Sequence, residues 1–307
     1  MGEQGAVYTV RTGTCLAWVG ASCVMMLDLS SDGAPEAVWT TDLNGAGEES
    51  MQLTLGELEL SIVQPGSSAS HNIGTGAMVW QAGPALAATL MSCGGGSLRE
   101  QFQSGRAIEL GCGCSALPGV SAALLGAAEV LVSDSAAVID QLRPNVEAYF
   151  ATDDAVAAAK GAPPILRTPL RDVLAVAPLA WDDPAALGDL ARHEHGRSIV
   201  LAADCDYADT LHAMLLNAVS AALSPTCTSV ALFATAARCQ RTLRLFLSRL
   251  SERRFDVVEL SAALEPLPPS AAAPSPAHDD GVRYFAARWR STEDARAARA
   301  RFANAVR

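Results

Sequence analysis

Two cysteines and two glycines alternate in the segment AIELGCGCSALPGV, residues 107–120, and these residue types could do two kinds of chemistry. Cys112 and Cys114 could supply thiolates to a metal ion or to a redox reaction. Gly111 and Gly113 could instead form a turn that brings the backbone close to a nucleotide, because glycine lacks a Cβ atom. The rest of the chain must decide between these two chemistries.

A metal site is the weaker alternative. A C-x-C pair gives two thiolates, whereas a structural zinc ion requires four ligands. The nearest histidine pair, His193 and His195, lies far along the chain in a polar segment, and the eight cysteines are scattered without a C-x-x-C pair. We therefore expect no metal, and we expect the two cysteines of the turn to pack as buried side chains.

A nucleotide-type site fits the position of the turn. Gly111 and Gly113 follow a predicted buried strand and precede a predicted helix, where a doubly wound fold binds a nucleotide at free helix N–H groups. Asp134 ends the next predicted strand, 21 residues after Gly113, and its carboxylate could bind both ribose hydroxyls. The alternative for Asp134 is a cap on the helix that begins near Ser135. The G-x-G-x-x-A spacing also suits a nicotinamide cofactor, but no catalytic constellation of a hydride-transfer enzyme accompanies it.

Strands and helices alternate over most of the chain, which predicts an α/β fold with a Rossmann-like, seven-stranded, mostly parallel sheet. The last two strands have no helical pattern between them, only a Pro- and Ala-rich connection, so we expect an antiparallel closing pair at one edge. Pro144 is expected to bend or break its helix. The predicted strands are 106–110, 129–134, 164–170, 197–204, 229–237, 255–260 and 281–289.

Three regions are expected along the chain. Residues 1–70 alternate short apolar runs with turn residues, which indicates a small β-rich N-terminal extension. Residues 71–290 form the main α/β domain, and residues 291–307 form an arginine-rich tail, expected as a solvated helix. The apolar segment 15–29 is shorter than the ~20 residues that span a bilayer. We therefore expect a soluble protein without membrane contact, cytoplasmic in location, with the nucleus as the alternative.

The composition limits the partners. The chain has 307 residues, of which half are hydrophobic and 18% charged, with a net charge of −11 and a pI near 4.9. A nucleic-acid partner would require a basic face for its phosphates, so we expect none. An acidic surface suits a basic partner, although solubility alone is the alternative explanation. The sequence does not indicate an oligomeric state.

Four motifs in collinear order resemble the family 16 methyltransferases, the seven-β-strand protein methyltransferases that use S-adenosylmethionine. The resemblance spans roughly residues 70–290. It is carried by GAMVWQAGPALA, similar to G-x-x-V-W before a helix; by IELGCGCSALPGVSAALLGAAEVLVSD, similar to the E-L-G-x-G turn through the ribose-binding Asp; by APLAWDD, similar to L-x-W after the third strand; and by VLAADCDYAD, similar to the D-x-x-Y that closes the fourth strand.

Two features point to different branches of that family. SALPGV after the turn and SDS after the second strand look most like the branch named methyltransferase-like protein 23, a histone arginine methyltransferase. Tyr207 in the D-x-x-Y motif is similar instead to the lysine-modifying members. The acceptor therefore stays open between lysine, which we favour, and arginine.

The resemblance implies S-adenosylmethionine as the cofactor and a set of residues that bind it. Trp181 would cover the adenine face, with a core tryptophan as the alternative. Asp134 would bind the ribose, Trp80 would wall the methionine end, and the backbones of the glycine turn and of Ala203 would approach the ligand. The implied cofactor-binding residues are Trp80, Gly111, Cys112, Gly113, Asp134, Trp181 and Ala203.

Asp204 and Tyr207 are the catalytic residues that the resemblance implies. They follow the fourth predicted strand at its C-terminal edge, where substrates meet cofactors in open α/β sheets. Methyl transfer needs an uncharged nucleophile held about 3 Å from the methyl group. Asp204 could orient an amine or a guanidinium, with a helix cap as the alternative role, and Tyr207 could offer its ring or its hydroxyl.

We therefore predict a methyltransferase whose substrate is a protein with a basic segment. A small-molecule methyltransferase is an alternative that a closed apolar pocket would favour, whereas an open acidic groove would favour a protein tail. A non-catalytic binding protein on the same fold is another alternative, and the presence of both Asp204 and Tyr207 argues against it. A nicotinamide-dependent oxidoreductase ranks behind these.

Overall fold

The structure of the protein is a computed structural model. It describes residues 8–12, 15–20, 23–28, 37–43, 49–55, 57–64, 74–92, 97–103, 105–159, 168–193, 196–226, 228–236, 238–260 and 282–304. The Pro- and Ala-rich connection before the last strand lies outside these residues, as does His195.

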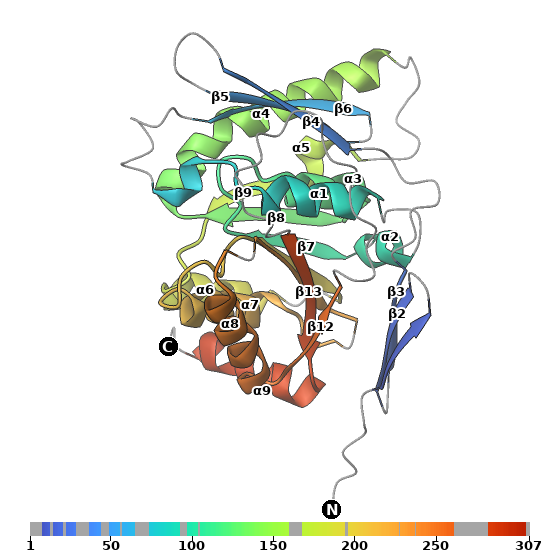
Figure 1. The fold of residues 1–307 in the computed structure, drawn as a ribbon, viewed down its shortest axis with the longest axis vertical. Helices are drawn as coiled ribbons and strands as arrows, with labels where there is room; N and C mark the ends of the chain where they lie inside the picture. The colour runs from blue at the N-terminus through green and yellow to red at the C-terminus, as the bar shows by residue number, and fades with distance from the viewer. Residues whose placement is uncertain are drawn as a thin grey trace, which may run out of the picture.

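A seven-stranded sheet forms the centre of the molecule (Figure 1). Its strand order is β12-β13-β11-β10-β7-β8-β9, and β13 runs in the opposite direction to the other six strands. The mostly parallel α/β sheet and its antiparallel closing pair are thereby confirmed. The strands are β7 (Arg106–Leu110), β8 (Glu129–Asp134), β9 (Leu174–Pro178), β10 (Ser198–Ala203), β11 (Val230–Ala236), β12 (Phe255–Glu259) and β13 (Val282–Trp289).

The strand order creates a switch point between β7 and β10. The chain moves outward from β7 to β8 and β9, and then returns to the other side of β7 to continue with β10 and β11. The connections after β7 and β10 therefore leave in opposite directions. In open parallel sheets the crevice at such a point, outside the carboxyl ends of the strands, is where ligands bind.

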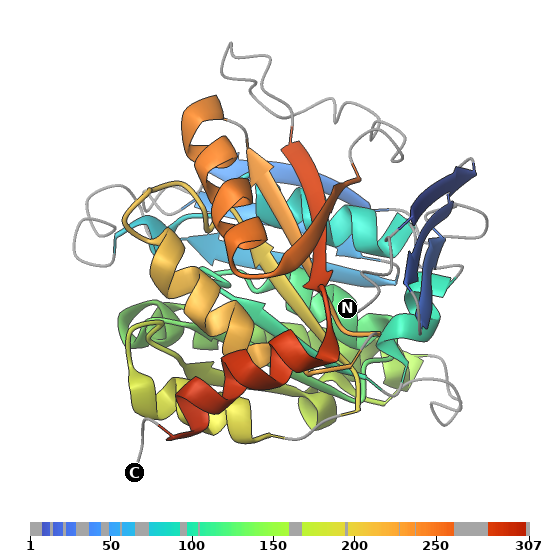
Figure 2. The same cartoon turned by 90° about the horizontal axis from the view of Figure 1, so that it is seen from below.

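Helices cover both faces of the sheet. Side chains alternate along each strand, so Ile199 and Leu201 of β10 join one core while Val200 and Ala202 join the other. One face carries α1 (Ala82–Ser92), α3 (Leu117–Leu124) and α4 (Ala136–Ala159); the other carries α6 (Pro184–Arg192), α7 (His212–Ala222), α8 (Gln240–Glu252) and α9 (Thr292–Asn304), as Figure 2 shows from below. Among the described residues, no helix is both long and apolar enough to cross a membrane.

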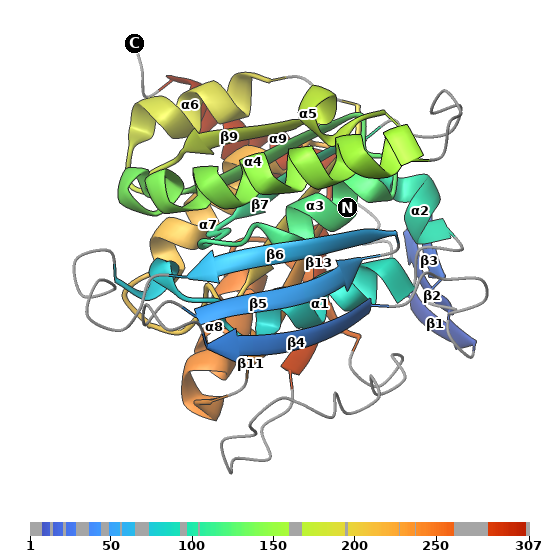
Figure 3. The same cartoon turned by 90° about the horizontal axis from the view of Figure 1, so that it is seen from above.

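The N-terminal residues form two small antiparallel sheets. Strands β4 (Ala37–Leu43), β5 (Glu49–Leu55) and β6 (Leu58–Gln64) lie over α1 and beside α4 in Figure 3. Strands β1 (Tyr8–Thr12), β2 (Cys15–Gly20) and β3 (Cys23–Asp28) form the other sheet. These strands agree with the β-rich character expected of residues 1–70, while the division of the chain into domains stays a prediction.

Strand β6 is joined to the main fold by its side chains and its backbone. Every second residue of β6 is buried, as expected of a strand with one face on a core. Asn145 of α4 accepts a hydrogen bond from the Val63 N–H (3.0 Å) and donates to the Val63 carbonyl (3.0 Å). Its amide also donates to the Cys114 carbonyl at 2.7 Å. One α4 side chain therefore connects the edge of the small sheet to the glycine turn.

The expectation for the third strand is wrong in position. The strand is β9. Residues 164–167 of the predicted segment lie outside the described residues, and its last residue begins the short helix α5 (Leu170–Val173). Strand β9 lies at the edge of the sheet and is only partly buried. Its sequence LAVAP is apolar and follows the predicted segment closely, and an apolar run alone does not decide which of two neighbouring short segments forms the strand. Pro144 does not break its helix, because α4 continues on both sides of it. Residues 97–102 form the short helix α2 (Ser97–Phe102).

The C-terminal helix is packed rather than solvated all round. Ala295 and Arg299 of α9 are buried against the helices of the second face. The Arg299 guanidinium donates to the carbonyls of Ala191 and His193 near the end of α6. Arginine has a long apolar stem and several donors, so Arg299 can pack in a buried position. The other two arginines of the helix, Arg296 and Arg301, are exposed.

Candidate active site

A cavity of about 580 Å³ opens at the switch point of the sheet. Its size lies within the roughly 300–1,000 Å³ of small-molecule and cofactor sites. The tertiary structure brings together eight of the nine site residues predicted from the sequence. Those that line the cavity are Trp80, Gly111, Gly113, Asp134, Trp181, Ala203, Asp204 and Tyr207.

The glycine turn forms one wall of this cavity. Gly111 and Gly113 adopt left-handed backbone conformations, with φ of +68° and +59°. A Cβ atom on Gly111 would lie 2.6 Å from the Cys205 sulfur and 3.1 Å from the Trp181 ring. The turn therefore requires glycine at position 111 both for its dihedral angle and for its space. With no side chain at either position, a ligand can approach the backbone directly.

The cysteines of the turn do not face the cavity. Cys112 and Cys114 are both buried, and the Cys112 side chain packs in the core beneath the turn. Burial raises the pKa of the Cys114 thiol to about 12 and that of Cys112 well above its usual range. Two buried, protonated thiols are packing groups. Cys112, predicted among the cofactor-binding residues, is therefore placed behind the site.

Asp134 lies beside the turn because the parallel register pairs Leu110 of β7 with Ser133 of β8. Its carboxylate accepts hydrogen bonds from the Gly113 N–H (3.0 Å) and the Ser135 N–H (2.7 Å). Burial raises the pKa of Asp134, and these two hydrogen bonds oppose that shift. Each carboxylate oxygen has two lone pairs, so Asp134 can hold the turn and still accept hydrogen bonds from a ligand.

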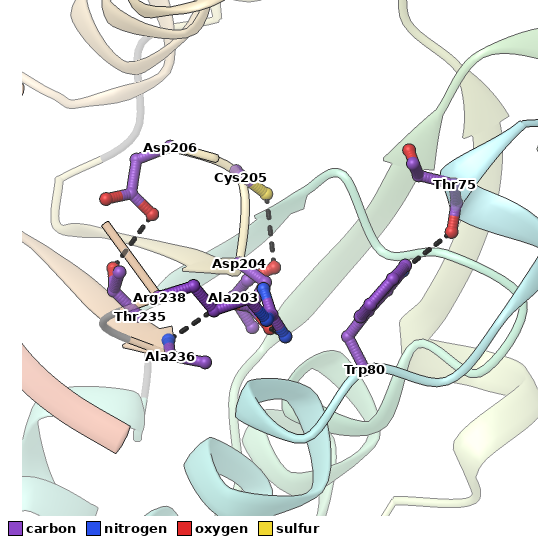
Figure 4. Close-up of polar contacts among 9 residues, drawn as sticks. All are labelled: Thr75, Trp80, Ala203, Asp204, Cys205, Asp206, Thr235, Ala236 and Arg238. Carbon is purple, nitrogen blue, oxygen red and sulfur yellow. Dashed lines mark hydrogen bonds and ion pairs between the residues drawn. The ribbon is translucent and has the colours of Figure 1, made fainter. Parts of the chain in front are cut away.

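Aromatic side chains line the cavity from separate parts of the chain. Trp181 follows β9 and reaches the glycine turn, whereas Trp80 precedes α1 and is 38% exposed. The Trp80 indole N–H donates to the Thr75 carbonyl at 2.7 Å, as Figure 4 shows. The Tyr207 hydroxyl lies 3.2 Å from the Thr75 hydroxyl. Thr75 therefore contacts both Trp80 and Tyr207, which come from separate parts of the chain.

Asp204 is fixed by the backbone of the neighbouring strand. Its N–H donates to the Ala234 carbonyl (2.8 Å), and its Oδ1 accepts from the Ala236 N–H (2.8 Å). The residue is buried and has a φ of +53°, a conformation that costs energy outside glycine. Its Oδ2 accepts from the Arg238 guanidinium at 3.0 Å (Figure 4). Asp204 is thus a preoriented carboxylate that is paired with a cation.

Some residues of the site were missed from the sequence, among them two polar residues that contact the predicted ones. Arg238 and Thr75 both line the cavity. A signal for Arg238 existed, because it follows the predicted strand 229–237, and the carboxyl ends of parallel strands meet at one edge of the sheet. Thr75 lies in the short helix η2 (Thr75–Ala77), and no spacing pattern connects it to Tyr207. Its role follows only from the tertiary contact.

Glu109 is a buried carboxyl group behind the turn. It is 2% exposed and accepts a hydrogen bond from the Gly119 N–H at 2.7 Å, near the start of α3. Burial raises its pKa to about 8, and the negative charge of Asp134 adds to this effect. Glu109 is therefore protonated at neutral pH in the folded protein.

Glu109→Gln should remove a pH dependence of stability. The unfolded chain releases this proton near pH 4.5, while the folded protein holds it up to about pH 8. The stability from this group is therefore full below pH 4.5 and should fall by about 1.4 kcal/mol per pH unit towards pH 8. Glutamine keeps an oxygen for the Gly119 N–H but does not titrate. Urea denaturation at several pH values measures the difference; equal slopes for the two proteins would contradict the prediction.

The fold and the cavity together define a class of protein. A doubly wound sheet with a glycine turn, a carboxylate after the next strand and an indole over the turn is a binding site for a nucleotide-type cofactor. Residues 58–161 match the family described as lysine methyltransferase. This match confirms the resemblance drawn from the motifs and identifies the chain as similar to S-adenosylmethionine-dependent methyltransferases, although it does not confirm the resemblance to one branch.

The match covers only part of the cavity lining. It includes Gly111, Gly113 and Asp134 but ends before Asp204 and Tyr207. Trp181 and Ala203 of the cofactor set also lie beyond the matched residues, so the roles of the cavity residues stay predictions. No curated protein matches the sequence.

Solved structures with a similar fold are distant in sequence. A protein from Streptococcus mutans described as a S-adenosylmethionine-dependent methyltransferase has 12% identity and a TM-score of 0.47, covering 78% of this chain and 55% of that one. This chain therefore spans about half the length of that structure. The human methyltransferase 10 domain containing protein has 12% identity and a TM-score of 0.40, covering 69% and 84%. The ribosomal protein L11 methylase of Lactobacillus delbrueckii has 15% identity and a TM-score of 0.35, covering 66% and 77%.

Proposed function

We propose that this chain transfers a methyl group from S-adenosylmethionine to a side-chain nitrogen of a protein, with lysine as the favoured acceptor. The observation that carries the proposal is that the predicted cofactor-binding residues and the predicted catalytic residues line the same cavity. The cofactor set surrounds the glycine turn, and Asp204 and Tyr207 follow β10 at the same edge of the sheet. A methyl donor bound by the first set would therefore meet an acceptor held by the second.

The cofactor set fits S-adenosylmethionine by its chemistry. Gly111 and Gly113 line the cavity without side chains, so a ligand could approach the backbone of the turn. Asp134 offers carboxylate lone pairs to ribose hydroxyls, and Trp181 offers an apolar ring face to adenine. When bound, S-adenosylmethionine supplies a methyl group whose bond to sulfur breaks, leaving the electron pair on sulfur, as the acceptor nitrogen forms its bond to carbon.

Asp204 and Tyr207 would orient the acceptor. The Asp204 carboxylate can accept hydrogen bonds from a nitrogen that approaches the cavity, which directs the nitrogen lone pair away from Asp204. Tyr207 is 51% exposed, so its ring and hydroxyl are available at the entrance. A lysine ammonium must lose one proton before it can attack, and the exposed entrance lets water take it. The proposed catalysis is therefore mainly positioning.

Arginine is the second candidate acceptor because a guanidinium already fits the site. The Arg238 guanidinium lies between the Asp204 carboxylate and the Trp80 ring, 4.8 Å from the ring centroid. An arginine of a protein substrate has the same planar group and could make the same contacts. We also propose that the protein substrate has a basic segment and that the enzyme acts in the cytoplasm.

Calorimetric titration with S-adenosylmethionine, with NAD as the control ligand, tests the cofactor. Binding of S-adenosylmethionine alone would support the proposal, whereas binding of NAD alone would overturn it. Transfer of a labelled methyl group to matched basic peptides, one containing lysine and one containing arginine, then tests the acceptor. Binding without transfer to either peptide would contradict the protein-substrate proposal and favour a small-molecule acceptor or a binding role.

Asp134→Asn should weaken the affinity for S-adenosylmethionine by about 1–3 kcal/mol, because it removes the charge from the hydrogen bonds to ribose. Calorimetry measures this loss directly. Asp140→Asn is the matched control, since Asp140 is an exposed carboxylate on the adjoining helix α4. An unchanged affinity in Asp134→Asn would restrict Asp134 to its structural hydrogen bonds with Gly113 and Ser135.

A further inference from the structure

Arg238 places a positive charge at the cavity that the proposed reaction does not use. The residue follows β11, and its side chain is about half exposed (47%). Its guanidinium is 3.0 Å from Asp204 Oδ2 and 4.8 Å from the centroid of the Trp80 ring. Figure 4 shows it on the side of Asp204 that faces Trp80. Arg238 therefore occupies the space between the carboxylate and the indole.

Backbone groups hold the two walls of this space, Asp204 and Trp80, whereas Arg238 enters it with a half-exposed side chain. Asp204 is held by the backbone of β11 through Ala234 and Ala236. Trp80 is held through its indole N–H by the Thr75 carbonyl. Arg238 reaches the space from the surface on a long flexible side chain. The Arg238 side chain is half exposed, so water can solvate its guanidinium when it leaves, whereas the Asp204 side chain is only 5% exposed and needs another cation in its place.

A carboxylate opposite an indole face is a binding site for an organic cation. The carboxylate supplies charge-assisted hydrogen bonds, and the face of the indole attracts positive charge. We propose that Arg238 is an internal cation that occupies the acceptor position and is displaced by the cationic group of the substrate. This inference rests on the proposed function and makes Arg238 a specificity-determining residue.

The burial of Asp204 explains how such a residue would select substrates. Displacing Arg238 with a neutral group would leave a buried carboxylate without a counter-charge, which is strongly unfavourable. An ammonium or a guanidinium replaces the lost charge, so the exchange is nearly balanced. Acceptors without a positive group are therefore rejected, and the intrinsic affinity for cations is lowered by the competition with Arg238.

Removal of Arg238 should open the site to small cations. The probes are methylguanidinium and n-butylammonium chloride, and the signal is the NMR resonance of the Trp80 indole N–H, assigned with Trp80→Phe. We expect Arg238→Ala to bind methylguanidinium about tenfold more tightly than the unaltered protein. Arg241→Ala is the matched control, since Arg241 lies on the adjoining helix α8 with its side chain 82% exposed. It should bind like the unaltered protein.

The double variant Arg238→Ala with Asp204→Asn locates the binding. It should lose the gain in affinity, because the carboxylate that holds the cation is absent. The inference is overturned if Arg238→Ala binds the cations no more tightly than the unaltered protein, or if the double variant binds them as tightly as Arg238→Ala. Arg238→Gln, which keeps most of the side-chain length, should give the same gain and serves as a second variant.

The titrations separate this inference from the proposed function. They are made with and without S-adenosylhomocysteine, and calorimetry on the same samples reports the binding of that ligand. Failure to bind S-adenosylhomocysteine would count against the proposed function alone. Normal binding of S-adenosylhomocysteine with no effect of Arg238→Ala would count against the inference alone.

Discussion

Asp204→Asn is expected to reduce methyl transfer by about 10²–10³-fold while leaving the affinity for S-adenosylmethionine unchanged. The side chain of Asp204 lies on the acceptor side of the cavity, and the cofactor set lies around the glycine turn. Asparagine has the same shape and keeps an oxygen for the Ala236 N–H, but it lacks the charge that would orient an amine or a guanidinium. Transfer is measured with labelled methyl groups on basic peptides, and cofactor affinity by calorimetry.

The choice of asparagine separates catalysis from folding. Asp204→Ala would leave the buried Ala236 N–H without its acceptor, which costs about 1–3 kcal/mol of stability. Asp189→Asn is a matched control, because Asp189 is an exposed carboxylate on α6. Transfer by Asp204→Asn at the rate of this control would remove Asp204 from the mechanism. A parallel loss of cofactor affinity would instead place it on the cofactor side.

Gly111→Ala is expected to abolish cofactor binding, with a loss of affinity of at least about 100-fold. Alanine is strained at the φ of +68°, which costs about 1 kcal/mol. Its Cβ atom would also lie 2.6 Å from the Cys205 sulfur and 3.1 Å from the Trp181 ring. Both neighbours line the cavity, so any relaxation that removes these contacts displaces a wall of the site. Calorimetry measures the affinity, and thermal unfolding measures the stability.

Two further variants identify the cause of the loss. Gly83→Ala is the control, because Gly83 lies in helix α1, where an added Cβ atom would have nothing within 4 Å; it should increase stability by about 0.5–1 kcal/mol. Adding Cys205→Ala to Gly111→Ala removes the sulfur and should restore part of the affinity. If Gly111→Ala binds the cofactor as tightly as the unaltered protein, the glycine turn does not contact it.

Several elements of the fold could be predicted because their residues carry strong local signals. Strand β7 is fully buried and is followed by glycines, and both ends of the prediction agree with the structure. Strand β9 was placed wrongly because two short apolar segments, 164–166 and 173–177, follow each other closely, and an apolar run alone does not show which of them pairs with a neighbouring strand. The packing of α9 was missed for a related reason: Arg299 is a polar residue by type, and only its position between α9 and α6 shows that it is buried.

Local residue patterns were enough to establish the α/β fold, the glycine turn and the carboxylates at the strand ends. Alternating strands and helices produce a parallel sheet, and a parallel sheet gathers the carboxyl ends of its strands at one edge. The pairing of groups at that edge was established by tertiary packing instead. This packing put Arg238 between Asp204 and Trp80 and brought Thr75 to Tyr207. Such contacts depend on side-chain directions in three dimensions, because they join residues from separate segments with no shared period or spacing in the chain.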